Sequence, residues 1–305
     1  MQYYKVLNIS DREIDNIEPL GTKWKFWYDD PDGRAYLFKA ARADGPEGKP
    51  VLRYGEDWAE KIVSEVAHKL DIPCVQYELA TYEGWNGVIT PIMTSDGEEL
   101  VHGNQLINNY LNTSSMVQAV DNSAHTVQIV IATLSDGKIL KPKNWRSLPG
   151  IKLPLDFFIG YLLLDTLVSN QDRHQQNWGV IQTADATVHL SPTFDHAASL
   201  GRNESDERRE QILKAGERGF NIERYVRRAK SLLYSNGVKL KTIDAFHEFA
   251  VVSESAKDSW LEKLDKLKES EIVDIVQKVP CGIMTDMSKD FCISLIKANK
   301  SRLLG

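Results

Sequence analysis

Residues 169–179 read SNQDRHQQNWG, and residues 191–196 read SPTFDH. The first stretch follows residues 155–168, an apolar run that predicts a buried helix because its apolar side chains are not confined to one face. Two short β-like runs, residues 178–182 and 187–190, separate the two stretches. Asp172 and Asn177 are therefore expected on a loop that follows a buried helix, and Asp195 is expected directly after a hairpin.

This combination of two carboxylates and one amide suits phosphoryl transfer. One carboxylate must orient the attacking hydroxyl and accept its proton, and we assign this role to Asp172. The second carboxylate and the amide oxygen must hold Mg²⁺, which prefers oxygen ligands, and we assign Asp195 and Asn177 to the metal. The alternative is that these are ordinary loop residues, since Asp and Asn favour turns. The buried helix and the hairpin that precede them favour the site.

Lys39 is the candidate for holding the phosphates of a nucleotide. It ends the run Tyr36-Leu37-Phe38, where strand alternation places it on the same face as Leu37. Taken alone, it is better explained as an edge lysine that reaches solvent. A carboxylate on the following helix would fix its position, and Glu60 and Glu65 are the candidates; at ~100° per residue they lie roughly 140° apart, so only one can face the site. We favour Glu60.

Gly21, Thr22 and Lys23 precede the first strong strand and form a candidate phosphate loop. A glycine there allows backbone N–H groups to approach a phosphate closely. The segment is not a Walker A loop, and a plain turn is the alternative interpretation.

The chain as a whole predicts an α+β fold with two lobes. Strands are expected at residues 23–28, 35–40, 75–82 and 87–90, and a helix with apolar residues at helical spacing from Ile62 to Leu70 should end before Pro73. Residues 42–55 are rich in Gly, Pro and charge and predict a loop. The sequence after Met93 is mostly helical, and from about Arg208 it predicts charged amphipathic helices. We therefore divide the chain into a β-rich N-lobe, residues 1–93, and a helical C-lobe, residues 94–305.

Composition excludes several other classes of protein. The 305 residues carry a net charge of −6 and no long basic run, which argues against direct binding to nucleic acid or to a membrane. The three cysteines suit neither a zinc site nor a disulfide scaffold. The N-terminus lacks the pattern of a signal peptide, and the longest apolar stretch is too short to span a bilayer. We therefore expect a cytoplasmic protein.

With these residues assembled, the sequence resembles the HipA-like serine/threonine kinases, a bacterial branch of the kinase superfold that also includes the phosphoinositide kinases. The matching segments span about residues 21–200 and include residues 21–27, 36–39, 56–60, 101–105, 170–179 and 190–196. The most specific of them are the Asn-x-Asp-Arg-His-x-x-Asn-x-Gly and Pro-x-Phe-Asp-His motifs.

The resemblance implies a two-lobed kinase fold, ATP and Mg²⁺ as cofactors, and a protein as the phosphorylated substrate. It places the adenine near Thr90, Pro91, Ile92 and Met93 at the junction of the lobes, and it assigns His174 to the nucleotide site. Several family members are toxins that phosphorylate an aminoacyl-tRNA synthetase and are restrained by an antitoxin protein, so these are the partners that it implies.

Two departures from the toxins of this family stand out. The chain begins almost at the glycine loop, as the short HipT-type members do, without the extra N-terminal subdomain of the long ones. The toxins also phosphorylate a serine in or before that loop, whereas residues 17–22 read IEPLGT. Either Thr22 replaces the serine, or Glu18 keeps the loop acidic. A binding module with a kinase fold, and a lipid or small-molecule kinase, are the alternative functions.

Overall fold

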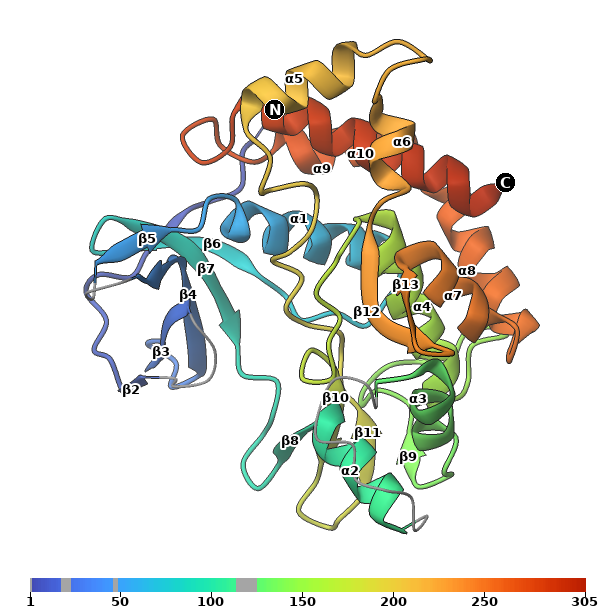
Figure 1. The fold of residues 1–305 in the computed structure, drawn as a ribbon. Helices are drawn as coiled ribbons and strands as arrows, with labels where there is room; N and C mark the ends of the chain where they lie inside the picture. The colour runs from blue at the N-terminus through green and yellow to red at the C-terminus, as the bar shows by residue number, and fades with distance from the viewer. Residues whose placement is uncertain (1, 18–22, 46–48, 114–124) are drawn as a thin grey trace.

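The computed structural model describes residues 2–17, 23–45, 49–113 and 125–305. Gly21 and Thr22, which we predict to form a phosphate loop, lie outside these ranges. Figure 1 shows the strands of the N-terminal part grouped at one side of the molecule and most of the helices at the other, with helix α1 (Glu56–Lys69) between them. The predicted mixed fold, with a β-rich part followed by a helical part, is confirmed.

The N-terminal part is built on one large sheet. Within the described residues the order of the strands is β1-β6-β7-β4-β3-β2. The short strand β5 pairs with the C-terminal end of β4, at residues 42–44. All its neighbouring strands are antiparallel except β1 and β6. The strands are β1 (Leu7–Asn8), β2 (Asn16–Ile17), β3 (Lys23–Asp29), β4 (Ala35–Asp44), β5 (Pro50–Leu52), β6 (Glu78–Tyr82) and β7 (Trp85–Pro91).

The C-terminal part combines helices with two small sheets. One sheet has the order β8-β10-β11-β9, and the other is the hairpin β12-β13. The strands are β8 (Glu99–His102), β9 (Ile139–Leu140), β10 (Gly179–Gln182), β11 (Val188–Leu190), β12 (Lys230–Ser235) and β13 (Val238–Lys241). The helices are α2 (Gly103–Thr113), α3 (Val127–Leu134), α4 (Pro154–Leu167), α5 (Asp206–Lys214), α6 (Ile222–Val226), α7 (Thr242–Ala250), α8 (Glu254–Lys266), α9 (Glu269–Gln277) and α10 (Asp286–Leu304). No helix in the described part of the chain is both long enough and apolar enough to cross a membrane.

Two segments differ from the sequence prediction. The sequence predicts a loop at residues 42–55. Instead, β4 extends as far as Asp44, because Arg42 and Ala43 pair with Leu52 and Val51 of β5. The C-terminal tail was expected to be helical throughout, but it contains the β12-β13 hairpin. Asn236 and Gly237 at its turn both have positive φ, the conformation that an Asn-Gly hairpin turn requires.

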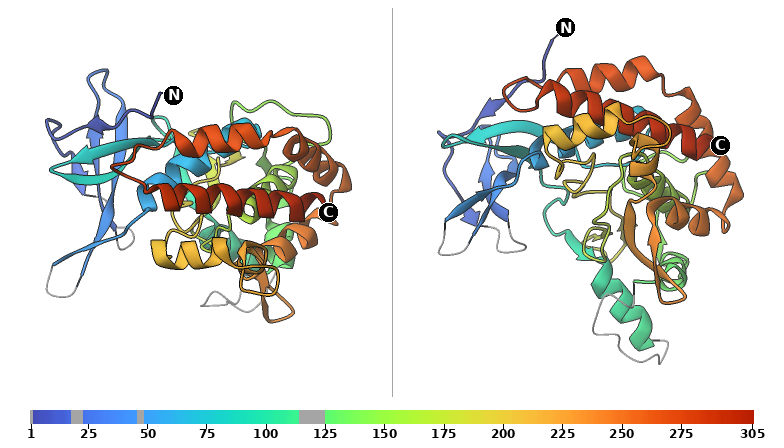
Figure 2. Two further views of the ribbon diagram at one scale, coloured as in Figure 1. Left: turned by 90° about the horizontal axis from the view of Figure 1, so that it is seen from above. Right: turned by 45° about the horizontal axis from the view of Figure 1, so that its top comes forward.

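The side chains form two hydrophobic cores. The smaller core lies in the N-terminal sheet and includes Phe26, Phe38, Tyr82 and Ile89. The larger core runs through the helical part around the buried helix α4, and it also takes in the apolar face of α1. Figure 2 shows α9 and α10 crossing the molecule close to α1, and α1 contacts α9 directly. Helix α1 therefore packs as part of the large core, although it precedes β6 and β7 in the chain.

Candidate active site

Lys39 lies where the N-terminal sheet packs against α1. It is on β4, and its ammonium is 3.6 Å from a carboxylate oxygen of Glu60 on α1 and 3.9 Å from a carboxylate oxygen of Asp195. Glu65, the competing candidate, forms an ion pair with Lys61 at 2.6 Å instead. Burial would lower the pKa of Lys39, but the Asp195 and Glu60 carboxylates outweigh burial and raise it. The ammonium therefore stays charged.

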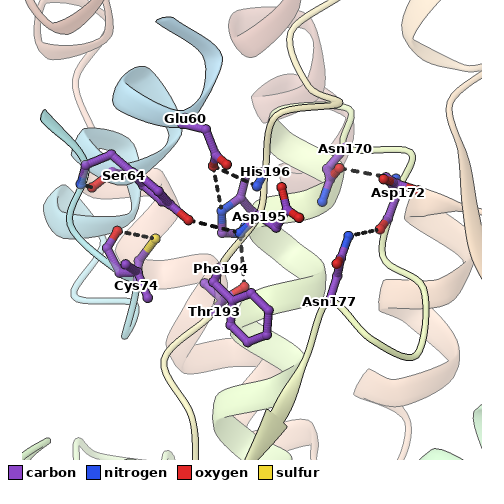
Figure 3. A network of polar contacts seen from close by, with 12 residues as sticks. Glu60, Ser64, Cys74, Asn170, Asp172, Asn177, Thr193, Phe194, Asp195 and His196 are labelled. Atoms are coloured by element: carbon purple, nitrogen blue, oxygen red, sulfur yellow. Dashed lines mark hydrogen bonds and ion pairs between the residues drawn. The ribbon is translucent and has the colours of Figure 1, made fainter. Parts of the chain in front are cut away.

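The loop that follows α4 is organised by its own polar groups. The Asp172 N–H donates to the side-chain oxygen of Asn170 at 3.2 Å, and the Asp172 carbonyl accepts from the His174 N–H at 2.8 Å. The same carbonyl accepts from the side-chain amide of Asn177 at 2.7 Å. Because the NH₂ group of Asn177 is turned to the loop, its amide oxygen is turned away from the loop (Figure 3).

Asp195 occupies an uncommon backbone conformation. Its φ is 56°, in the left-handed region that non-glycine residues rarely adopt. Two consecutive backbone N–H groups form hydrogen bonds here. The Asp195 N–H donates to the Tyr77 hydroxyl at 3.3 Å, and the His196 N–H donates to a Glu60 carboxylate oxygen at 2.8 Å. Figure 3 shows Asp195 between the Glu60–His196 contact and the loop that carries Asn170 and Asn177.

A buried arginine joins the two loops. Arg173 binds Asp165 of α4 through two hydrogen bonds of 2.8 Å, one from Nε and one from Nη2. Its guanidinium also donates to the carbonyl of Asn177 and, at 3.4 Å, to that of Phe194. The Asp172 loop and the Asp195 loop are thus held by one side chain, which is inaccessible to solvent.

His196 completes this buried network in its neutral form. Arg173 Nη2 lies 3.1 Å from His196 Nε2, and a guanidinium can only donate, so Nε2 accepts. Burial, reinforced by the Arg173 charge, holds the pKa of His196 well below its usual value. The imidazole therefore adds no positive charge beside Lys39.

Most of the predicted residues that the structure describes line a cavity of about 710 Å³. From the sheet, Lys25, Trp27, Leu37 and Lys39 line it, together with the segment Thr90–Met93. Across from them it is lined by His174, Gln176, Asn177, Phe194 and Asp195. This volume lies within the range of ligand pockets in proteins.

The donor groups of the cavity fit a hard cation. Asn177 and Asp195 both line it and offer an amide oxygen and a carboxylate, the ligand types that Mg²⁺ prefers. Such a site keeps several waters and phosphate oxygens in its coordination shell, so two protein ligands are sufficient.

The remaining predicted residues that the structure describes are Glu60, Asp172 and Lys23. Glu60 lies behind Lys39, buried, and is not part of the cavity lining. Asp172 is half-buried and also lies outside the lining, although its loop neighbours His174 and Asn177 belong to it. Lys23 begins β3.

Two contributors to this site, Lys25 and Tyr77, were not predicted from the sequence. Lys25 pairs directly with Lys39 across β3 and β4 and lines the same cavity. Its position two residues after Lys23 was the available signal. Tyr77, which contacts both Lys39 and Asp195, carries no signal in its local sequence.

His125 contacts Trp178, the residue that follows Asn177. The burial of His125 predicts that the stability of the protein depends on pH. Its Nε2 accepts from the Trp178 indole at 3.1 Å, so Nδ1 carries the proton and donates to the Leu232 carbonyl at 2.8 Å. Burial lowers the pKa of His125 to about 4. The unfolded chain therefore binds more protons than the folded one between pH 6.5 and 4, and acidification through this window should remove about 2–3 kcal/mol of stability.

The matched variant is His125→Gln, because glutamine can reproduce both hydrogen bonds without titrating. Urea unfolding at pH 4.5 and 7.5 should show a smaller loss of stability on acidification in His125→Gln than in the wild type. His68→Gln, at an exposed histidine, should behave as the wild type does. Equal losses in the wild type and His125→Gln would contradict the assignment.

The topology and this site define a two-lobed kinase-like fold, and comparison with solved structures confirms the fold. The chain is similar to the Helicobacter pylori proinflammatory kinase CtkA, with a TM-score of 0.75 and 18% identity over 98% of this chain and 95% of that one. HipA of the Shewanella oneidensis MR-1 toxin–antitoxin system, in complex with HipB and operator DNA, gives a TM-score of 0.49 at 10% identity, covering 96% and 65% of the two chains. A Golgi casein kinase gives 0.45 at 12% identity, covering 100% and 73%. No protein-family model and no curated protein matches the sequence.

Proposed function

We propose that this chain is an ATP- and Mg²⁺-dependent serine/threonine protein kinase of the HipA-like type. The observation that supports this most is the position of Lys39, whose ammonium contacts both Glu60 and Asp195 at the wall of a nucleotide-sized cavity. A charged lysine oriented by a carboxylate beside a metal-binding aspartate is the arrangement that phosphoryl transfer requires.

In this proposal the nucleotide lies between the sheet and the Asn177 loop. The adenine contacts the segment Thr90–Met93, and Lys39 binds the phosphates. We also assign Gly21, Thr22 and Lys23 to phosphate binding, and His174 contacts the nucleotide from the wall opposite the sheet.

Asp172 accepts the proton of the attacking hydroxyl in the proposed reaction. The hydroxyl oxygen forms a bond to the γ-phosphorus while the bond from that phosphorus to the β,γ-bridging oxygen breaks, and ADP leaves. Asn177 and Asp195 hold the metal, and bound Mg²⁺ would neutralise charge on the phosphate oxygens.

The proposed function also implies protein partners for this chain. We propose a protein substrate, with an aminoacyl-tRNA synthetase as the first candidate, and an antitoxin protein as a binding partner. HipA itself is described as part of a toxin–antitoxin system with HipB.

Residues 1–93 and 94–305 would act as the N- and C-lobes. We also propose a cytoplasmic location.

Labelling with γ-phosphate-labelled ATP tests the proposed function directly. The purified protein, incubated with Mg²⁺ and a bacterial lysate, is expected to transfer label to serine or threonine of a protein, and chelation of the metal should prevent the transfer. Label recovered only in lipid or in small molecules would contradict the protein-kinase assignment. Absence of any transfer, together with absence of ATP binding, would contradict the kinase assignment as a whole.

The Asp195→Asn variant tests the metal site separately. In the wild type Mg²⁺ should tighten ADP binding by about 10-fold, and this gain should largely vanish in the variant because the negative charge that attracts the cation is lost. Calorimetric titration of ADP with and without Mg²⁺ measures the difference. Asp185→Asn, on the exposed turn between β10 and β11, is the control and should keep the gain. Unchanged Mg²⁺ dependence in Asp195→Asn would remove Asp195 from the metal site.

A further inference from the structure

Tyr77 lies at the boundary between α1 and the sheet, just before β6. Its side chain is buried, and its backbone N–H donates to the Ser64 hydroxyl of α1 at 3.4 Å. The segment that leads to it runs beside the Asp195 loop: the Val75 N–H donates to the Thr193 carbonyl at 3.0 Å, and the Thr193 N–H donates to the Pro73 carbonyl at 2.9 Å. Tyr77 is therefore fixed against the segment that ends at Asp195.

The Tyr77 hydroxyl accepts two hydrogen bonds from groups of the proposed active site. The Lys39 ammonium donates to it at 3.3 Å, and the Asp195 N–H donates to it at 3.3 Å. A tyrosine hydroxyl can accept such bonds without taking up a charge. It therefore orients the lysine while leaving the ammonium's charge available to phosphate, whereas a further carboxylate would compensate that charge.

Tyr77 and Glu60 play parallel structural roles around Lys39. Each of them contacts the ammonium, and each accepts one of two consecutive N–H groups, that of Asp195 or that of His196. The backbone at Asp195 is left-handed, a strained conformation for a non-glycine residue that persists only when its surroundings hold it. These two contacts thus couple the direction of the Asp195 carboxylate to the position of the lysine.

We propose that Tyr77 is a positioning residue whose hydroxyl holds Lys39 and the Asp195 backbone in the arrangement needed for joint binding of nucleotide phosphate and metal. Because it concerns the nucleotide site, this role rests on the proposed kinase function. The alternative is that the tyrosine only fills space beneath the sheet, in which case its ring matters and its hydroxyl does not.

The substitution Tyr77→Phe separates these possibilities because it keeps the ring and removes the hydroxyl. The matched control is Tyr161→Phe on α4. Tyr161 is also buried, and its hydroxyl donates to the Ser191 carbonyl at 2.9 Å, so the control loses a buried hydrogen bond without taking an acceptor away from any N–H group. Circular dichroism and thermal melting should show both variants folded.

The first measurement uses the ligand-free protein and does not depend on activity. Amide hydrogen exchange in a peptide that covers residues 194–198 should be about 10-fold faster at Asp195 in Tyr77→Phe, since its N–H loses its acceptor. Tyr161→Phe should exchange there at the wild-type rate. Unchanged exchange in Tyr77→Phe, or an equal increase in both variants, would overturn the inference.

The second measurement tests the consequence for ligands. The gain in ADP affinity from Mg²⁺ should fall by about 3–10-fold in Tyr77→Phe, and kcat for phosphoryl transfer should fall by about 10-fold or more with a smaller change in the KM for ATP. An unchanged Mg²⁺ gain in Tyr77→Phe, beside a wild type that shows it, would overturn the positioning role. A wild type that binds no ADP would instead overturn the proposed function, while hydrogen exchange still decides whether the hydroxyl holds the loop.

Discussion

Asp172→Asn is expected to lower the rate of phosphoryl transfer by roughly 10²–10⁴-fold, the usual contribution of a positioned general base. ATP affinity should remain nearly unchanged, because Asp172 lies outside the cavity lining. The loop should also keep its shape, since Asp172 organises it with main-chain atoms: its N–H donates to Asn170, and its carbonyl accepts from His174 and Asn177. Single-turnover kinetics and calorimetric ATP binding measure the two quantities independently.

Asp185→Asn provides the same chemical change at an exposed position and should keep full activity. Loss of ATP binding together with activity in Asp172→Asn would indicate a structural role for the carboxylate. It would also favour the interpretation of Asp172 as an ordinary loop residue.

The largest effect on stability is expected from Arg173→Met. Asp165 is buried and receives two hydrogen bonds from the guanidinium, so removal of Arg173 leaves a carboxylate in the protein interior without its cation. Breaking a buried pair in this way lowers the free energy of unfolding by about 3–5 kcal/mol. Urea unfolding at neutral pH should show this loss.

The double variant Arg173→Met/Asp165→Asn identifies its cause. Asparagine removes the negative charge and keeps a side-chain oxygen for the Asn170 amide, which donates to Asp165 at 2.8 Å. The double variant should therefore be more stable than the single one. Arg208→Met, at an exposed arginine of α5, should change stability little. If the double variant were no more stable than Arg173→Met, lost packing would be the cause.

The sequence predicted those parts of the site that follow from local pattern. Asp172 and Asn177 stand at a fixed spacing after a buried apolar helix, and Asp195 follows a hairpin, so their neighbourhood could be inferred. Local pattern also favoured Glu60 over Glu65. In the structure Glu60 contacts Lys39, whereas Glu65 pairs with Lys61 at the i,i+4 spacing along α1.

Other contributions could not be inferred from local pattern. Arg173 lies within the quoted motif, yet nothing in its neighbours indicates that it is buried and connects two loops. Tyr77 sits in an expected strand, and its partners, Lys39 and Asp195, are distant in sequence. The β12-β13 hairpin was missed although Asn236-Gly237 is a strong turn signal, because the surrounding charged residues suggested continuous helix.

Lys39 lies on β4 and Glu60 on α1, so the ion pair between them joins the sheet to the helix. Helix α1 is anchored to the helical part, since Lys69 at its end pairs with Glu271 at 3.1 Å and the adjoining Asp71 pairs with Lys263 at 2.6 Å. Separation of β4 from α1 would pull Lys39 away from Glu60, so the lysine keeps this orientation only while the sheet and the helix stay packed together.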